Sequence, residues 1–217
     1  MTKKEICERY LKVYSAAVCD VLDGLGFTNQ AIVENLHPVT FSAKLVGYAT
    51  TAKGTPTSLK IDPTNNYGLK FVDGLLEDQI VVIDAAGDRS SAHWGELMST
   101  AAKSKGCRGA LILGGIRDVE KIVELGFPVF YQHKIPTDIN GRWNYIEFGI
   151  PIVKGNVTIH QDDFILGDLS GVVVIPNSLV MKVLLEAEEI VRVEHTVREK
   201  LKRGESPLEV FKIYGKF

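Results

Sequence analysis

The sequence predicts an α/β protein, and three patterns support this fold class. Helix-like and strand-like segments alternate through the middle of the chain, strand-like segments dominate from about residue 128 to 175, and a long amphipathic helix follows. No Pro- or Ser-rich linker divides the chain, so we expect residues 1–217 to form a single domain with an N-terminal helix and a long C-terminal helix. A chain of this length that is 45% hydrophobic can bury its own core.

The first expected element is a helix over residues 2–25. Its apolar residues recur at steps of three and four positions: Ile6, Tyr10, Val13, Ala17, Val21 and Leu25. Thr2 followed by Glu5 has the pattern of a capping box, and Gly24 and Gly26 end the segment.

The next segments predict strands and a second helix. Residues 36–54 favour strand, Gly54–Thr57 a loop, and Gln79–Ile83 a short buried strand that ends at Asp84. Residues 94–105 predict a helix with an apolar stripe made of Leu97, Ala101 and Ala102.

The second half of the chain predicts short strands between two helical regions. Ala110–Leu113 is a buried strand that leads into two glycines, and Val119–Glu124 is helical. Further strands are expected at Val129–Tyr131, Trp143–Phe148, Ile152–Ile159, Phe164–Leu166 and Val172–Ile175. Residues 178–203 predict the long helix, and Ser206–Phe217 a short helix and tail.

Charge and cysteine content exclude several classes of protein. A net charge of −2 argues against a nucleic-acid surface, and the densest basic stretch, residues 198–203, is interrupted by Glu199, so we interpret it as a solvated helix end. Three cysteines without zinc-type spacing predict reduced thiols in a cytoplasmic protein. Charged residues near the N-terminus break any apolar run, and we expect neither a signal peptide nor a membrane partner.

The first candidate for chemistry is the segment Gly114–Asp118, which we expect to form a tight turn after a buried strand. Two glycines there allow a sharp turn and a close approach to a ligand. Arg117 offers a planar fork for a carboxylate or a developing oxyanion, and Asp118 offers a hard oxygen ligand for Mg²⁺ or Mn²⁺. The alternative is a local ion pair of Arg117 with Asp118, Glu120 or Glu124 that caps a helix.

The second candidate is the helix start at His93–Leu97. Unpaired N–H groups at a helix start bind anions such as carboxylate, and Gly95 would let a ligand come close. The alternative is an ordinary helix start with Glu96 in its first turn. Histidine spacing supports no zinc site, and the chain contains neither a nucleophile elbow nor a phosphate-binding loop. No lysine stands out as a Schiff-base former, which favours metal-assisted chemistry.

At these residues the chain resembles the RraA-like proteins, which include regulator of ribonuclease activity A and the 4-hydroxy-4-methyl-2-oxoglutarate aldolases. The matching stretches occur in the expected order from about residue 15 to 205: Ala17–Gly26, Trp94–Leu97, Gly115–Glu120 and Gly167–Pro176. The ordered set is more specific than any one stretch.

The resemblance implies an α/β/β sandwich of the swivelling-domain type, assembled as homotrimers or homohexamers with sites between subunits. It implies that Asp118 holds Mg²⁺ or Mn²⁺, whose other ligands are mostly water. Arg117 would bind substrate and polarise the oxygen of the departing group. Backbone amides of Gly95, Glu96 and Leu97 would hold the carboxylate of the pyruvyl group.

The resemblance also implies two further acids. The aldolases carry an acidic residue that here falls at Glu96, separated from Arg117 by residues 97–116. The aldolase pattern prefers Asp at that position, so Glu96 departs from it by one methylene. A glutamate from the terminal helix of a neighbouring subunit also contributes in the aldolases, and Glu194 is its best match.

Three functional hypotheses follow, of which a structural protein with a vestigial site is the least favoured. The first is a class II lyase that cleaves a 2-oxoacid through a pyruvate enolate, of the 4-hydroxy-4-methyl-2-oxoglutarate/4-carboxy-4-hydroxy-2-oxoadipate aldolase type, with oxaloacetate decarboxylation on the same enolate. A water oriented by Glu96 or Glu194 would carry the proton. The second is an RraA-type protein that binds and inhibits a ribonuclease without catalysis. The presence of Arg117, Asp118 and an acid at position 96 favours the enzyme.

Overall fold

The computed structural model describes residues 1–33, 35–62 and 64–215, and it confirms the α/β fold. Within these residues, nine strands form one curled, mixed sheet, and β8 (Ile152–Lys154) and β9 (Val157–Ile159) form a separate hairpin. The strands of the large sheet are β1 (His37–Pro38), β2 (Leu45–Pro56), β3 (Gln79–Asp84), β4 (Ala92–Trp94), β5 (Gly109–Ile116), β6 (Val129–Lys134), β7 (Trp143–Phe148), β10 (Phe164–Asp168) and β11 (Gly171–Ile175).

The sheet is built around the long strand β2. One edge of β2 pairs in parallel with β3, and its other edge pairs antiparallel with β10 and then with β7. From β3 the parallel order continues through β5 to β6, so the carboxyl ends of these strands meet at one edge of the sheet. Beyond the end of β3, the short strand β4 pairs in parallel with the last residues of β5.

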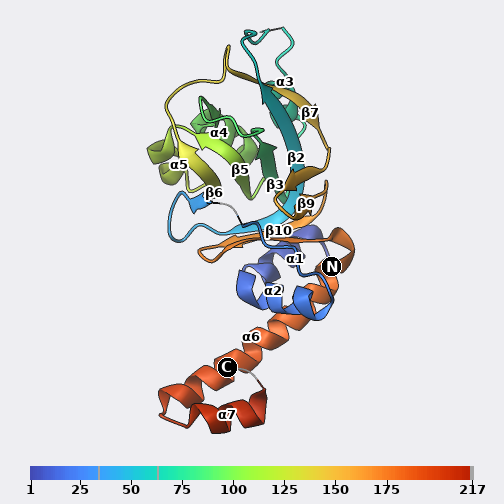
Figure 1. Ribbon diagram of the computed structural model, residues 1–217, viewed down its shortest axis with the longest axis vertical. Helices are drawn as coiled ribbons and strands as arrows, with labels where there is room; N and C mark the ends of the chain where they lie inside the picture. Colours follow the sequence, from blue (N-terminus) through green and yellow to red (C-terminus); the bar gives the residue numbers. More distant parts are fainter. Residues whose placement is uncertain (34, 63, 216–217) are drawn as a thin grey trace.

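Six of the seven described α-helices form two groups that cover different parts of the sheet (Figure 1), and α7 packs on α6. Their bounds are α1 (Lys3–Tyr10), α2 (Ser15–Gly24), α3 (Tyr67–Asp73), α4 (Glu96–Ser104), α5 (Val119–Leu125), α6 (Val180–Lys202) and α7 (Pro207–Tyr214). The group α3, α4 and α5 packs on the parallel strands around Trp94 and Trp143, and the group α1, α2 and α6 packs near β10 and β11 around Tyr10 and Phe164. A third apolar cluster lies between the sheet and the β8–β9 hairpin.

The predicted helix over residues 2–25 is two helices, α1 and α2. The predicted capping box at Thr2 and Glu5 is confirmed. The break falls at residues 11–14, because Tyr14 has an extended backbone and α2 starts anew at Ser15. The backbone N–H and the hydroxyl of Ser15 both donate to the carboxylate of Asp168, at 2.8 and 2.7 Å. A partner this distant in the sequence satisfies the new helix start, and periodicity could not reveal it.

Two strand predictions need correction. The predicted loop at Gly54–Thr57 is wrong for its first three residues, because β2 continues through Pro56 along β7. A Cβ on Gly54 would lie 2.0 Å from the ring of Trp143, so glycine allows this close pairing. The predicted strand Ile152–Ile159 is a hairpin that turns at Gly155, whose φ is +57°.

The remaining predictions agree with the structure within a few residues. The strands predicted from Gln79, Ala110, Val129, Trp143, Phe164 and Val172 and the helices predicted from residues 94, 119, 178 and 206 are present. The exception is the apolar stripe of α4, where Leu97 is 77% exposed and Ser99 is buried in its place. Residues 216 and 217 of the predicted tail lie outside the described residues. Among the described helices, none has the length and apolarity needed to cross a bilayer.

The predicted tight turn at Gly114 and Gly115 is wrong, because β5 continues through both glycines. A Cβ on Gly114 would lie 2.5 Å from the Cβ of Ala85 and 2.6 Å from Nδ1 of His93. A Cβ on Gly115 would lie 2.7 Å from Nε2 of His133. The two glycines therefore serve the close packing of histidine side chains on β5, and the turn comes only after the strand.

The substitution Gly114→Ala tests this packing. We expect it to lower the free energy of unfolding by about 1–3 kcal/mol, because the added methyl group must displace Ala85 and His93. Urea unfolding would measure the change. Gly24→Ala, where no atom lies within 4 Å of the added Cβ, is the control and should leave stability unchanged or slightly raised. Equal stability of the two variants would contradict the packing role.

Candidate functional site

The Arg117–Asp118 pair occupies the turn between β5 and α5. The backbone N–H of Arg117 donates to the carbonyl oxygen of Trp94 at 3.0 Å, which extends the pairing of β4 with β5 by one step. Asp118 then adopts a left-handed backbone with φ of 56°, a conformation that Asp tolerates better than most residues. Its side chain makes no capping bond to α5, so its carboxylate is available to the site.

The start of α4 meets this turn, as the sequence predicted. Gly95 precedes α4 in an extended conformation, and the N–H of Glu96 lies 3.4 Å from Oδ2 of Asp118. A Cβ on Gly95 would lie 2.9 Å from that same oxygen. Glycine at position 95 therefore keeps the helix start open toward the carboxylate, and the two candidate features form one site.

A third acid, Asp138, completes the charged part of the site. Nη1 of Arg117 lies 3.0 Å from Oδ2 of Asp138, whereas its Nε lies 3.7 Å from Oδ2 of Asp118. Both contacts are ion pairs of half-exposed side chains, and neither Glu120 nor Glu124 takes part. These residues line a cavity together with parts of β4, α4 and the loop after β6: Ala92, His93, Trp94, Gly95, Leu97, Met98, Arg117, Asp118, Asp138 and Ile139.

The sequence reasoning missed Asp138. A signal was present, because Asp138 follows β6, whose carboxyl end meets the carboxyl end of β5 at the same sheet edge. Oδ1 of Asp138 accepts the N–H of Asn140 at 2.7 Å, an Asx turn that such sequences often form without any functional role. The turn pattern alone could not reveal that the second oxygen faces Arg117.

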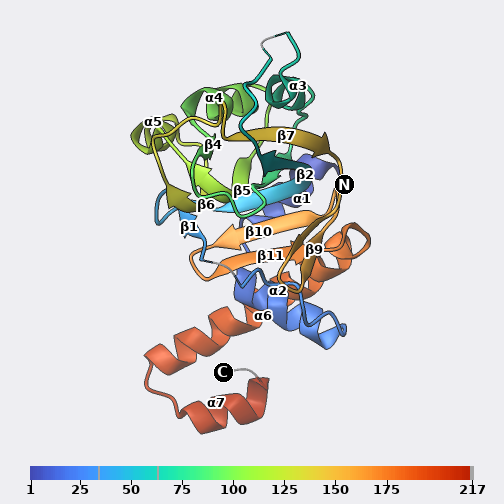
Figure 2. The ribbon, with the colours of Figure 1, turned by 45° about the horizontal axis from the view of Figure 1, so that its top comes forward.

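Three other predicted residues, Glu96, Leu97 and Glu194, do not direct their side chains into the cavity as plainly as Arg117 and Asp118 do. Glu96 turns its carboxylate back along α4, where Oε1 accepts the hydroxyl of Thr100 at 2.8 Å. Leu97 lines the cavity but is mostly exposed. Glu194 lies on α6, which leaves the body at the end opposite α4 and α5 (Figures 1 and 2), and it accepts a hydrogen bond from the hydroxyl of Tyr14. The fold of one chain therefore does not bring Glu194 to Arg117.

The donor set at Asp118 fits a hard divalent cation. Among the residues that the structure describes, no three His, Cys, Asp or Glu side chains converge on one point. Mg²⁺ nevertheless binds through one or two carboxylates and keeps several water ligands. The Asp118 side chain is 43% exposed, which leaves room for such waters beside its carboxylate.

Behind the site, a buried histidine ties β4 to β5. Nδ1 of His93 accepts the N–H of Gly115, and Nε2 pairs with Oδ2 of Asp88, both at 3.0 Å. Burial lowers the pKa of His93 below its usual 6.5, against the opposing effect of Asp88. For Asp88, burial acts to raise the pKa, but hydrogen bonds from Ser91 and Ser90 prevail and lower it to about 2. The pair is therefore a neutral imidazole held by a carboxylate.

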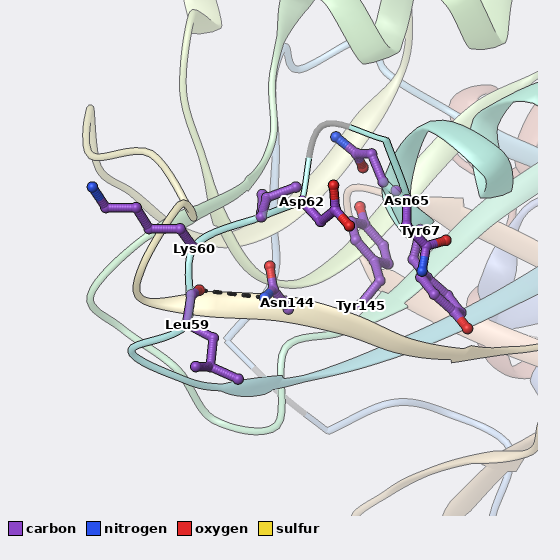
Figure 3. A pocket seen from close by; sticks show the side chains of 10 residues that line it. Leu59, Lys60, Asp62, Asn65, Tyr67, Asn144 and Tyr145 are labelled. Carbon is purple, nitrogen blue, oxygen red and sulfur yellow. Dashed lines mark hydrogen bonds between the residues drawn. The ribbon is translucent and has the colours of Figure 1, made fainter.

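A second pocket lies apart from the predicted site residues (Figure 3). It is lined by residues of the loop after β2, of α3 and of β7. Two of its polar side chains are engaged locally: Asp62 accepts two bonds from Thr64, and the amide of Asn144 donates to the carbonyl oxygen of Leu59. We therefore assign no chemistry to this pocket.

Comparison with known proteins identifies relatives over most of the chain. The sequence profile of a family described as RraA-like (Aldolase/RraA) matches residues 15–174. Protein DlpA of Legionella pneumophila is 26% identical over 203 residues, or 94% of this chain, but the chain spans only 32% of the length of DlpA. A protein of Halalkalibacterium halodurans named "Putative 4-hydroxy-4-methyl-2-oxoglutarate aldolase" is 29% identical over 83% of this chain and 81% of that protein.

Solved structures share the fold. One described as novel cellulases from microbes associated with the gut ecosystem is 36% identical, with a TM-score of 0.85 over 90% of this chain and 88% of that chain. RraAS2 of Streptomyces coelicolor, described as an unusual member of the RNase ES inhibitor RraA protein family, is 22% identical, with a TM-score of 0.78 over 89% and 96%. At 22% identity, the likeness to RraAS2 shows only that the two proteins share a fold.

The buried imidazole predicts a pH-dependent stability. Because the pKa of His93 is lowered in the folded protein, the unfolded chain binds more protons at acidic pH, and stability present at pH 7 is lost as the pH falls below about 6.5. We expect His93→Gln to show a smaller loss of unfolding free energy between pH 7 and pH 5 than the wild type. Burial also lowers the pKa of His133, so part of the loss should persist.

Urea unfolding at both pH values measures this difference. Gly24→Ala keeps every titrating group and serves as the control, which should follow the wild-type pH dependence. An identical loss in His93→Gln and the wild type would show that the His93 imidazole is not the group responsible.

Proposed function

Because the chain belongs to the RraA-like family, we propose that it is a divalent-metal-dependent lyase that cleaves a carbon–carbon bond of a 2-oxoacid. The reaction would be of the 4-hydroxy-4-methyl-2-oxoglutarate/4-carboxy-4-hydroxy-2-oxoadipate aldolase type, with oxaloacetate decarboxylation as a related activity of the same site. The observation that carries the proposal is the convergence of the α4 start, Asp118 and Arg117 on one cavity. The relative of H. halodurans supports it by name.

The helix start would bind the acid end of the substrate. The backbone N–H groups of Gly95, Glu96 and Leu97 precede or open α4, where N–H groups lack helical partners and attract a carboxylate. The N–H of Glu96 faces Asp118 in this structure, and it would pass to the substrate carboxylate when Asp118 holds a cation. Asp118 would hold Mg²⁺ or Mn²⁺ beside them. When bound, such an ion supplies Lewis-acid stabilisation of the charge that develops on the keto oxygen.

Arg117 and the nearby acids would act on the far side of the breaking bond. In a retro-aldol step, a base removes the proton of the C4 hydroxyl group, the C3–C4 bond breaks, and its electron pair stays on C3, which is then protonated. Arg117 would donate to the C4 oxygen and favour its negative charge. Glu96, with its carboxylate turned from Thr100 toward the cavity, or Glu194 of a second copy in a trimer or hexamer, would orient the water that carries the proton.

Binding of a ribonuclease is the alternative function that the family allows. The likeness to RraAS2 concerns the fold, and the exposed charge pairs at the site are compatible with either function. The charged cavity favours catalysis, because a protein contact does not need a carboxylate, a guanidinium and a helix start directed at one small space. A pull-down with a ribonuclease would separate the two functions.

Metal-dependent release of pyruvate is the first test. Purified protein is incubated with 4-hydroxy-4-methyl-2-oxoglutarate or oxaloacetate and Mg²⁺, Mn²⁺ or EDTA, and pyruvate is read by a coupled dehydrogenase. We expect pyruvate with either metal and its loss with EDTA. Asp118→Asn should lower the metal-dependent rate at least about 100-fold, because a neutral amide is a poor ligand for a hard cation.

Asn is chosen at position 118 because it tolerates the left-handed backbone there, so the variant should unfold at the wild-type urea concentration. Asp73→Asn, at an exposed position on α3 that pairs with Lys105, is the control for loss of a carboxylate. If neither substrate gives metal-dependent pyruvate, the proposed function is refuted. If Asp118→Asn keeps full activity, Asp118 is not the metal ligand.

Glu194 gives a test of the shared site. We expect Glu194→Gln to lower kcat about 10- to 100-fold, because the water that carries the proton would lose the carboxylate that orients it. Metal affinity should be retained, because Asp118 is unchanged and Glu194 would reach the site only from a second copy. Oligomers reassembled from Asp118→Asn and Glu194→Gln subunits should recover part of the activity, since some of their sites contain neither change. Wild-type kcat in Glu194→Gln would remove this residue from the site.

A further inference from the structure

Two carboxylates limit the N–H donors that Arg117 has left for a substrate. A guanidinium binds a carboxylate best through two parallel N–H donors on one edge, either Nη1 with Nη2 or Nε with Nη2. In this structure the closest approach to Asp138 uses Nη1, and the closest approach to Asp118 uses Nε. Each edge therefore already has one donor facing a carboxylate, and Nη2 is the donor that neither closest approach uses.

The charge of the cavity points the same way. Its charged lining consists of Arg117, Asp118 and Asp138, which leaves one net negative charge. Glu96 directs its carboxylate to Thr100, and the cation Lys134 lies in an adjoining hollow with its ammonium group over the ring of Tyr131. A divalent cation and the 2-oxoacid carboxylate together add one positive charge. The occupied cavity is then neutral, and a second substrate carboxylate would face Asp138 uncompensated.

We propose that Asp138 is a specificity-determining residue that selects 2-oxoacids whose departing fragment carries no carboxylate. With Asp138 in place, Arg117 donates to a single oxygen, as needed for a ketone or aldehyde leaving from a C4 alkoxide. The favoured substrate class is a 4-hydroxy-2-oxoacid with an uncharged tail. This inference rests on the proposed function, and it makes the two dicarboxylate test substrates, 4-hydroxy-4-methyl-2-oxoglutarate and oxaloacetate, poorer substrates than a 4-hydroxy-2-oxoacid with an uncharged tail. The first of them is also the substrate in the name of the H. halodurans relative.

The substitution Asp138→Asn isolates the charge from the fold. Oδ1 of Asp138 accepts the N–H of Asn140, and an asparagine keeps an acceptor in the same place, so the loop after β6 should retain its turn. The second oxygen, which faces Arg117, becomes a neutral amide or is replaced by its NH₂ group. Asp73→Asn again serves as the control, because it removes an exposed carboxylate on α3, outside the cavity.

A matched pair of unreactive ligands tests the selection by binding alone. 2-Oxopentanoate and 2-oxoglutarate have the same chain length and differ at C5, a methyl group in the first and a carboxylate in the second. Each is titrated calorimetrically into wild-type protein and both variants at saturating Mg²⁺. We expect the wild type and Asp73→Asn to bind 2-oxopentanoate more tightly, and Asp138→Asn to shift the affinity ratio toward 2-oxoglutarate by about fivefold, as for a partly exposed ion pair.

The outcomes separate this inference from the proposed function. Tighter binding of 2-oxoglutarate by the wild type, or a ratio in Asp138→Asn within about twofold of the wild type, would overturn the role of Asp138 even if pyruvate release is observed. If both ligands bind but no substrate is cleaved, the proposed catalysis fails while the affinity ratio still decides the selection. If neither ligand binds, the 2-oxoacid site itself is refuted and this inference with it.

Discussion

The parallel pairing of β4 with the end of β5 is the contact on which the candidate site depends. This pairing places the carbonyl oxygen of Trp94 within hydrogen-bond distance of the N–H of Arg117. The start of α4 therefore lies beside the turn that follows β5. Only Gly95 separates Trp94 from Glu96, the first residue of α4, so little freedom remains in the approach of the Glu96 N–H group to Asp118. The site is thus an extension of a strand edge, where parallel sheets offer converging loops.

The pairing in turn requires that β5 carry no side chains at two successive positions. His93 fills the space beside Gly114, and His133 fills the space beside Gly115. His93 also fixes the position of β4 relative to β5. Its Nδ1 accepts the N–H of Gly115, and its Nε2 pairs with Asp88. A buried polar network of this kind stabilises a structure only when its members are paired, and the low pKa of Asp88 reflects that pairing.

The functional groups themselves lie at the rim of this rigid support. Arg117, Asp118 and Asp138 are each between a third and a half exposed, in contrast to the buried strand behind them. Such exposure suits a site that exchanges water for a metal ion and a small acid. Glu194 lies on α6, which extends away from α4 and α5 (Figure 2), so in the proposed function this acid would come from a second copy. Family membership and the geometry of one chain are the two observations that support the proposed small-molecule site at this rim.

The sequence alone determined the fold class, most strands and helices, and the two halves of the site, because hydrophobic periodicity and short-range chemistry are local properties. It predicted that Arg117, Asp118 and the helix start at Gly95 belong to one site, and the structure places them side by side, yet it assigned the double glycine to a turn. Only the tertiary structure decided that these glycines make room for His93 and His133, that Asp168 starts a separate helix at Ser15, and that Asp138 faces Arg117. Each of these three features depends on a partner from a distant part of the chain, and local sequence patterns do not reveal that partner.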